Sequence, residues 1–203
     1  MAPESAAGLR KGGHRVWLVR HGETEWARLG RHTGRTDIPL TDVGREQARV
    51  LGRRLAGHPF AVVLTSPLSR AVETTTIAGY GAVAIDDPDL LEWDYGEFEG
   101  RVTEEIRVDY PNWTIWRGPW PGGETIDEVG ARADRVLDRI SGVAGETLIV
   151  AHGHLLRILT ARWLGLAPTS GGLFALDTAT ISVLGRDRDT RVIETWNETC
   201  HLG

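Results

Sequence analysis

The chain has 203 residues, of which 41% are hydrophobic and 25% are charged, and this composition suits one domain with a substantial core. Its net charge of -5 excludes a bulk positive field that would attract nucleic acid or an anionic membrane. The single cysteine, Cys200, excludes an intramolecular disulfide and a cysteine-rich metal site.

Residues 1–13 are small, polar and glycine-rich, and we interpret them as a disordered lead-in to one domain spanning residues 14–203. They lack the apolar stretch of a signal peptide, and no run of the chain approaches the about 18 apolar residues of a membrane helix. We therefore expect a cytoplasmic protein that binds neither a membrane nor nucleic acid.

The first half of the domain alternates short apolar runs with helical patterns. In chain order the pattern predicts a strand at 16–19, a helix from Thr41 to near Gly57, a strand at 60–64, a helix from Ser66 to near Gly79 and a strand at 83–85. Ser66 followed by Pro67 is typical of a helix start, because serine can cap the helix and proline suits its first position.

Residues 92–124 interrupt this rhythm. They contain four tryptophans among many glycines and prolines, namely Trp93, Trp113, Trp116 and Trp120. We interpret the segment as a small aromatic-rich cap over the site, and its tryptophans either line a lid or form core.

The second half returns to alternation. The pattern predicts a helix after the capping box of Thr125 and Glu128, a strand at 148–151, a helix at about 154–164 and strands at 181–184 and 191–196. Strands that alternate with helices predict an α/β fold, a three-layer α/β/α sandwich with a mostly parallel central sheet.

Polar clusters follow three of the predicted strands. Arg20 and His21 follow the first strand, Arg70 follows the second, and His152 and His154 follow the fourth. If these strands are neighbours, their ends bring two arginines and two or three histidines to one rim, where ligands of such sheets bind. Arginines grip a tetrahedral anion through forked hydrogen bonds, and an unprotonated histidine can attack phosphorus.

A phosphoryl transfer at this rim also needs an acid that protonates the leaving oxygen. Glu92 is our candidate, because it opens the cap segment just beyond the third strand. Asp94, Glu97, Glu99 and Glu124 are nearby alternatives, although we expect Glu124 to serve the start of the helix that follows it.

Six sequence blocks, in order, resemble those of the histidine phosphatase superfamily, also called the phosphoglycerate mutase-like family. The blocks are Arg20-His21-Gly22-Glu23-Thr24, Thr33-Gly34-Arg35-Thr36-Asp37-Ile38-Pro39-Leu40-Thr41, Thr65-Ser66-Pro67 with Arg70, Glu92 with Gly96, Glu99 and Gly100, Pro121-Gly122-Gly123-Glu124-Thr125, and Ala151-His152-Gly153. The similarity is greatest to the small acid phosphatase and sugar-bisphosphatase branch.

The resemblance implies a phosphoglycerate mutase-like fold and a role for each matching residue. It implies His21 as the phosphohistidine nucleophile and Glu92 as the proton donor. The other implied groups are Arg20, Arg70 and His152 as the phosphate pocket, with Thr33, Gly34 and Gly153 as supporting contacts. His154, directly after the last block, is a candidate substrate contact. The family needs no metal or other cofactor, and many members form homodimers.

Three functions remain open at this point. We favour an acid phosphatase-type phosphomonoesterase that acts on small phosphorylated metabolites. A phosphoglycerate mutase-type isomerase is the alternative, but Ala27 stands where the mutases usually carry an asparagine that helps hold phosphate, and the stretch between Glu92 and His152 is short. A non-catalytic protein that binds a phosphorylated ligand is the third.

Overall fold

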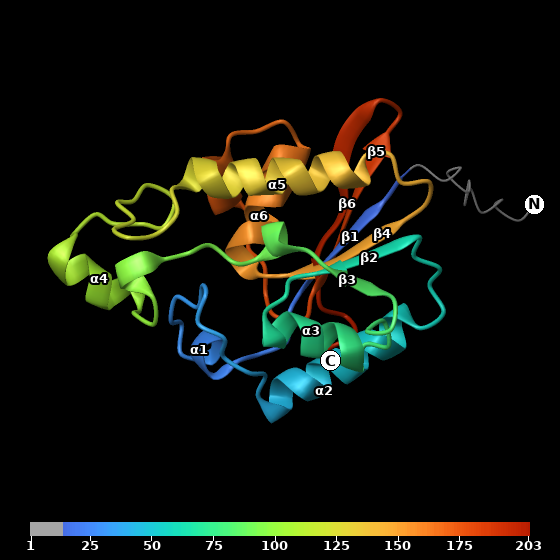
Figure 1. The fold of residues 1–203 in the computed structure, drawn as a ribbon, viewed down its shortest axis with the longest axis horizontal. Coiled ribbons are helices and arrows are strands. Elements are labelled where there is room, and N and C mark those ends of the chain that lie inside the picture. Colours follow the sequence, from blue (N-terminus) through green and yellow to red (C-terminus); the bar gives the residue numbers. More distant parts are fainter. Residues whose placement is uncertain (1–13) are drawn as a thin grey trace, which may run out of the picture.

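A six-stranded mixed sheet forms the centre of the computed structural model, which describes residues 14–203, so that the predicted lead-in lies outside it (Figure 1). The strands are β1 Val16–Arg20, β2 Val62–Thr65, β3 Ala84–Asp86, β4 Thr147–Ala151, β5 Ile181–Asp187 and β6 Thr190–Glu198. Their order is β3-β2-β4-β1-β5-β6, with β5 antiparallel to β1 and β6 antiparallel to β5. The other pairs are parallel, as the alternation predicted.

Helices cover both faces of the sheet. They are α1 Glu25–Arg28, α2 Asp42–Leu55, α3 Ser69–Ile77, α4 Thr103–Asp109, α5 Ile126–Ile140 and α6 Gly153–Trp163, with short 3-10 helices at Pro88–Leu90, Gly96–Phe98 and Pro168–Leu173. Figure 1 shows α5 and α6 on one side of the sheet and α2 and α3 on the other. Within residues 14–203 no helix combines the length and apolarity needed to cross a bilayer.

Two hydrophobic cores, one on each face, hold these layers together. Leu18 of β1 and Ile149 of β4 belong to the core beneath α5 and α6. Their neighbours Val19 and Val150 belong to the core beneath α2 and α3. Successive residues of a strand point to opposite faces, so a strand covered by helices on both sides is apolar throughout. The predicted three-layer sandwich is confirmed.

Two of the three predicted helix caps are present. Thr41 accepts a hydrogen bond from the N–H of Gly44 at the start of α2, with 3.0 Å between donor and acceptor. Thr125 and Glu128 form the predicted capping box of α5, in which the Thr125 N–H donates to the Glu128 carboxylate at 2.8 Å. Both caps satisfy N–H groups that the first turn of a helix leaves without an acceptor.

The third predicted cap is wrong. Helix α3 begins at Ser69 and not after Ser66, because the hydroxyl of Ser66 is engaged by His152, at 2.7 Å from its Nε2. Asp37, far away in sequence, caps the helix instead: its carboxylate accepts the Ser69 N–H at 2.9 Å. The local signal of serine followed by proline was therefore overridden by a tertiary contact.

The tryptophans of the cap segment (residues 92–124) act as core. Trp93 and Trp113 are buried, and three indole N–H groups donate to carbonyl oxygens of the same segment. These bonds run from Trp93 to Glu124, from Trp113 to Pro119 and from Trp120 to Ile115, at 2.8–2.9 Å. The aromatic residues thus hold together a segment with little regular structure.

Candidate active site

Three loops meet where neighbouring strands end. Because β2, β4 and β1 are adjacent, the loops that follow them share one edge of the sheet. The His21 N–H donates to the carbonyl of Ala151 at 2.9 Å, and the Ser66 N–H donates to that of Val150 at 3.0 Å. Both loops are therefore tied to the end of β4, from which His152 follows directly.

The protonation state of His21 follows from its contacts. Its Nδ1 lies 2.7 Å from the carbonyl oxygen of Gly22, which only accepts hydrogen bonds, so Nδ1 carries the proton. Nε2 is then the unprotonated nitrogen, with a lone pair available. The residue is buried, 4% exposed, yet it lines a pocket. An imidazole held in this tautomer is prepared for nucleophilic attack.

Burial and positive charge keep His21 neutral. Desolvation is the largest cause of a pKa well below the usual value, and the guanidinium groups of Arg70 and Arg20 lower it further. A neutral imidazole beside two cations can attack a dianionic phosphate without first losing a proton.

Arg70 and His152 lie directly behind His21 and not on the pocket wall. Arg70 is completely buried, and its Nε donates to His152 Nδ1 at 3.2 Å. Its terminal nitrogens donate to carbonyls of residues 33, 34 and 36 at 2.8–3.3 Å. The His152 and His21 rings are 5.1 Å apart between centroids. Since both nitrogens of His152 have protein partners, direct contact with a phosphate requires one of these bonds to be exchanged.

Arg20 and Gly153 line the pocket, and each has an N–H group without an acceptor among residues 14–203. One terminal nitrogen of Arg20 donates to the Leu176 carbonyl at 2.7 Å, while its Nε is buried with no partner among residues 14–203. A buried donor without an acceptor is costly, and an anion in the pocket would satisfy it. Gly153, beside this guanidinium, is the first residue of α6, so its N–H has no intrahelical acceptor. This part of the site suits a bound phosphate.

Glu92 lines the pocket beside the start of α6. Its Oε1 accepts the N–H groups of Trp93 and Leu155, both at 2.9 Å, and its Oε2 accepts that of His154 at 3.0 Å. The carboxyl is 4% exposed and lines the pocket. Oε2 carries only one of these bonds, so it keeps a position for a transferable proton.

The pocket has a volume of about 190 Å³. Of the residues predicted to form the site, His21, Glu92, Arg20, Thr33, Gly153 and His154 line it, whereas Arg70, His152 and Gly34 do not. Gly34 instead donates its N–H to Glu99 at 2.8 Å, so it shapes the loop. Ala27 is also on the wall, so the asparagine-like contact of the mutases is absent at this position.

Four further polar residues on the wall, Arg31, His32, Tyr95 and Arg157, were not predicted. Arg157 could have been found, because it lies one helical turn after His154 on the predicted helix. Arg31, His32 and Tyr95 come from irregular loops, where no periodicity signals orientation. Arg31 donates to the carbonyl of Gly100 and Arg157 to that of Gly171, and neither pairs with a carboxylate in the part of the chain that is described. We call the part of the lining formed by Arg31, His32, Thr33, Tyr95, His154 and Arg157 the far wall. Its two arginines make it positively charged.

Tyr95 sets the orientation of His154. The tyrosine hydroxyl and His154 Nδ1 are 2.6 Å apart. Burial keeps the pKa of Tyr95 well above its usual value, so its hydroxyl donates, and burial together with Arg157 keeps the pKa of His154 well below its own. His154 is thus neutral with its proton on Nε2, and it offers one N–H donor to a substrate.

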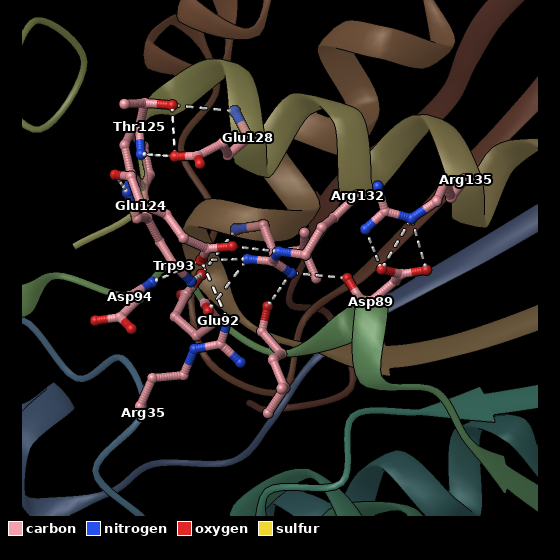
Figure 2. Close-up of polar contacts among 12 residues, drawn as sticks. Arg35, Asp89, Glu92, Trp93, Asp94, Glu124, Thr125, Glu128, Arg132 and Arg135 are labelled. Atoms are coloured by element: carbon pink, nitrogen blue, oxygen red, sulfur yellow. Dashed lines mark hydrogen bonds and ion pairs between the residues drawn. The ribbon is translucent and has the colours of Figure 1, made fainter.

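The structure assigns Glu124 a different role from the predicted one. It does not cap α5, since Thr125 and Glu128 do so. Its carboxylate is paired with Arg132, at 2.7 Å and 2.8 Å, and also accepts the N–H of Asp94 (Figure 2). Arg132 lies beyond the first turn of α5, so capping rules, which consider only the first turn of a helix, do not predict this contact.

The loop of His21 and the start of α2 are in backbone contact. A methyl group on Gly22 would stand 2.4 Å from the carbonyl oxygen of Gly44, and one on Gly44 would stand 2.2 Å from that of Glu23. Side chains essentially never approach main chain so closely, so only glycine fits at either position. The pair fixes how far the His21 loop extends from the sheet.

Because several histidines are buried, we expect the free energy of unfolding to decrease at acidic pH. Burial lowers the pKa of His32 to about 4, and the pKa values of His21, His152 and His154 are lowered well below the usual range, chiefly by desolvation. Below about pH 6.5 the unfolded chain takes up protons that the folded chain does not, so the free energy of unfolding decreases as the pH falls.

We expect a loss of about 1.4 kcal/mol per pH unit for each such histidine within that window. Urea unfolding at several pH values between about 7 and 5 measures it. His32→Asn should reduce the slope by one histidine's share. A free energy of unfolding that is constant over this range would contradict the neutral assignment.

Comparisons with known proteins agree with this geometry. The sequence model of the histidine phosphatase superfamily (branch 1) matches residues 16–199. An acid phosphatase of Mycobacterium tuberculosis is 38% identical over 194 residues, which cover 93% of this chain and 94% of that protein. Sedoheptulose 1,7-bisphosphatase of Saccharomyces cerevisiae is 35% identical over 185 residues, covering 75% of this chain and 68% of that enzyme.

Two further proteins are also similar to this chain. A 2,3-bisphosphoglycerate-dependent phosphoglycerate mutase of Gloeobacter violaceus is 35% identical over 159 residues, covering 70% of this chain and 72% of that protein. Among solved structures, the product of a functionally characterised open reading frame of Mycobacterium tuberculosis has a TM-score of 0.87 and 37% identity, covering 92% of this chain and 98% of that one.

Proposed function

Because the chain belongs to the histidine phosphatase superfamily, we propose that it hydrolyses small phosphate monoesters through a phosphohistidine formed on His21. Relatives named as phosphatases support a phosphatase activity. The observation that carries this mechanism is the Gly22 carbonyl on Nδ1 of His21, which leaves Nε2 unprotonated on a residue that lines a cationic pocket.

In the first step the Nε2 lone pair of His21 attacks phosphorus, and the bond from phosphorus to the ester oxygen breaks. Glu92 gives its proton to the departing oxygen, so that an alcohol leaves and not an alkoxide. In the second step Glu92 takes a proton from water, the water oxygen bonds to phosphorus, and the N–P bond breaks. Inorganic phosphate leaves, and His21 and Glu92 return to their starting states.

Positive charge around His21 stabilises the transferring group. The buried Nε of Arg20 has no partner in the described part of the chain and Gly153 lies beside this guanidinium, so both suit the equatorial phosphate oxygens. Arg70 keeps its charge just behind His21 and holds the loop of Thr33 and Gly34 through their carbonyls. His152 links Arg70 to Ser66 and packs against the nucleophile. In this proposal side chains and backbone supply the stabilisation that a metal supplies elsewhere.

The far wall supports a small acidic or hydroxylated metabolite as the substrate. Arg31 and Arg157, which pair with no carboxylate among residues 14–203, bring positive charge to a pocket of about 190 Å³, and His154 offers a neutral N–H. Thr33 is also on this wall, with its hydroxyl donating to the Arg31 carbonyl at 3.1 Å. The cytoplasmic location and the homodimer expected from the sequence remain proposals, supported by the single cysteine and by the family resemblance respectively.

A panel of phosphate monoesters tests the proposal. We expect release of inorganic phosphate from several small esters, with the rate unchanged when a metal chelator is added. Loss of activity on chelation would contradict the metal-independent mechanism. A folded sample inactive toward the whole panel would favour the non-catalytic ligand-binding alternative.

The mutase alternative is tested separately, because one relative is a phosphoglycerate mutase. The protein is incubated with 3-phosphoglycerate and a bisphosphoglycerate primer. Free phosphate is the expected product. Formation of isomerised phosphoglycerate without free phosphate would show that the protein is an isomerase and not a hydrolase.

A further inference from the structure

A buried arginine on α5 has every donor engaged, and it does not itself line the pocket. Arg132 is 7% exposed. Its Nε and one terminal nitrogen grip the two carboxylate oxygens of Glu124 at 2.7 Å and 2.8 Å (Figure 2). Its remaining N–H groups donate to the backbone carbonyls of residues 89, 91 and 92, at 2.8 Å, 2.7 Å and 3.3 Å. The guanidinium has five N–H groups, so none is left for a ligand.

The backbone that Arg132 holds is the segment that carries Glu92. Residues 91–95, between the two short 3-10 helices, form neither helix nor strand, so no ladder of backbone hydrogen bonds fixes them. Glu124 completes the clamp, because it accepts the Asp94 N–H at 3.0 Å and an ion pair from Arg35 at 3.3 Å. Its own carbonyl accepts the indole N–H of Trp93 at 2.8 Å. The backbone on both sides of Glu92 is thereby tied to α5.

The Glu92 side chain is held from the other side, by the N–H groups of His154 and Leu155 on α6. The backbone is thus fixed by one helix and the carboxyl by another, and both helices belong to the same layer. The distance from this layer to the His21 loop sets the reach of the carboxyl toward the leaving oxygen. A proton donor needs such placement, since a displacement of about 1 Å can cost about 100-fold in rate.

We infer that Arg132, paired with Glu124, is a positioning residue for the Glu92 proton donor. This rests on the proposed function. The side chains of Arg132 and Glu124 are 9% and 19% exposed. An ion pair so largely removed from water contributes little net stability once its desolvation is counted, so stability alone does not account for it. Lysine cannot replace the arginine here, because it has three donors at a single point and no planar fork.

The test compares two esters of different leaving-group quality. A nitrophenyl phosphate expels a stabilised anion that hardly needs a proton, whereas glycerol 3-phosphate expels an alkoxide that does. For Arg132→Lys we expect kcat/KM on glycerol 3-phosphate to fall roughly 10- to 100-fold, while the value on the nitrophenyl ester changes little. Adding Arg132→Lys to Glu92→Gln should cost almost nothing more, because the group it positions is already gone.

The matched control is Arg135→Lys. Arg135 lies on the same helix, three residues away, and pairs with the Asp89 carboxylate in an exposed ion pair. It touches neither Glu92 nor Glu124, and we expect its variant to treat both esters like the wild type. If Arg132→Lys does not fold, Glu124→Gln replaces it, since this change removes the charge of the clamp while keeping its shape.

Three outcomes would overturn the inference. One is an equal loss on both esters in Arg132→Lys, or in Glu124→Gln if that variant is needed, because this marks a general structural role. Another is no loss on either ester. The third is a full additional loss in the Glu92→Gln background. If the wild type hydrolyses neither ester, the proposed function itself is wrong. If Glu92→Gln shows the difference between the two esters and Arg132→Lys does not, the proposed function stands and only the inference about Arg132 is wrong.

Discussion

His21→Ala is expected to reduce phosphate release by roughly 10⁴- to 10⁶-fold, the range seen when an enzyme loses its nucleophile. Alanine removes the nitrogen that attacks phosphorus in the proposed mechanism, whereas both nitrogens of His152 are occupied and Nδ1 of His154 is bound to Tyr95. Steady-state rates on the phosphate ester panel measure this loss. Rapid quench of the wild type, followed by mass spectrometry of the His21 peptide, should detect the phosphoryl group.

The control for this prediction is His58→Gln. His58 packs against Trp17 and lies 2.7 Å from the Glu146 carboxylate, at residues that do not line the pocket. Its variant should retain wild-type activity. Substantial turnover by His21→Ala, or a phosphoryl group found on another residue, would show that a different group is the nucleophile.

Glu92→Gln is expected to lower kcat on alkyl phosphates by about 10²- to 10⁴-fold, the usual contribution of a placed acid. The amide has nearly the same shape as the carboxyl but cannot give a proton to the leaving oxygen. Its nitrogen would also face the N–H of a neighbouring residue, because the carboxylate accepts three backbone hydrogen bonds. The loss on a nitrophenyl ester should be much smaller.

Glu97→Gln is the matched control, since Glu97 is an exposed acid five residues away and does not line the pocket. The measurement is kcat of both variants on an alkyl phosphate and on a nitrophenyl phosphate. Similar losses on the two esters in Glu92→Gln would mean that the carboxyl organises the N-terminus of α6 and does not transfer a proton.

The elements of the sheet and the groups that follow its strands could be predicted from the sequence. Short apolar runs marked the strands, and polar residues at their ends marked the rim, because parallel strands have their carboxyl ends at one edge. The family resemblance, which the match over residues 16–199 confirms, identified the same groups. These signals are local, and a sequence displays them directly.

The remainder of the site depends on contacts between distant residues, which no local pattern contains. The sequence predicts that Ser66 caps a helix, but its hydroxyl forms a hydrogen bond with His152, 86 positions away. Tyr95 and His154 are 59 positions apart, and their contact determines which nitrogen faces the substrate. The sequence predicts that Glu124 serves the start of a helix, but its carboxylate pairs with Arg132 and accepts the N–H of Asp94, close to Glu92. In each case a buried polar group took the partner that the fold brought near, and not the one nearest in the chain.

The contact between Gly22 and Gly44 determines which parts of this site can be redesigned. Each of these two positions is closed off by main chain, so an added side chain cannot be accommodated by a rotamer change, and enlarging one glycine makes no room at the other. A mutant library aimed at new substrates is therefore better directed at side chains of the pocket lining, such as Arg31 and Arg157. It gains nothing from randomising the glycine pair, where nearly every member would be lost.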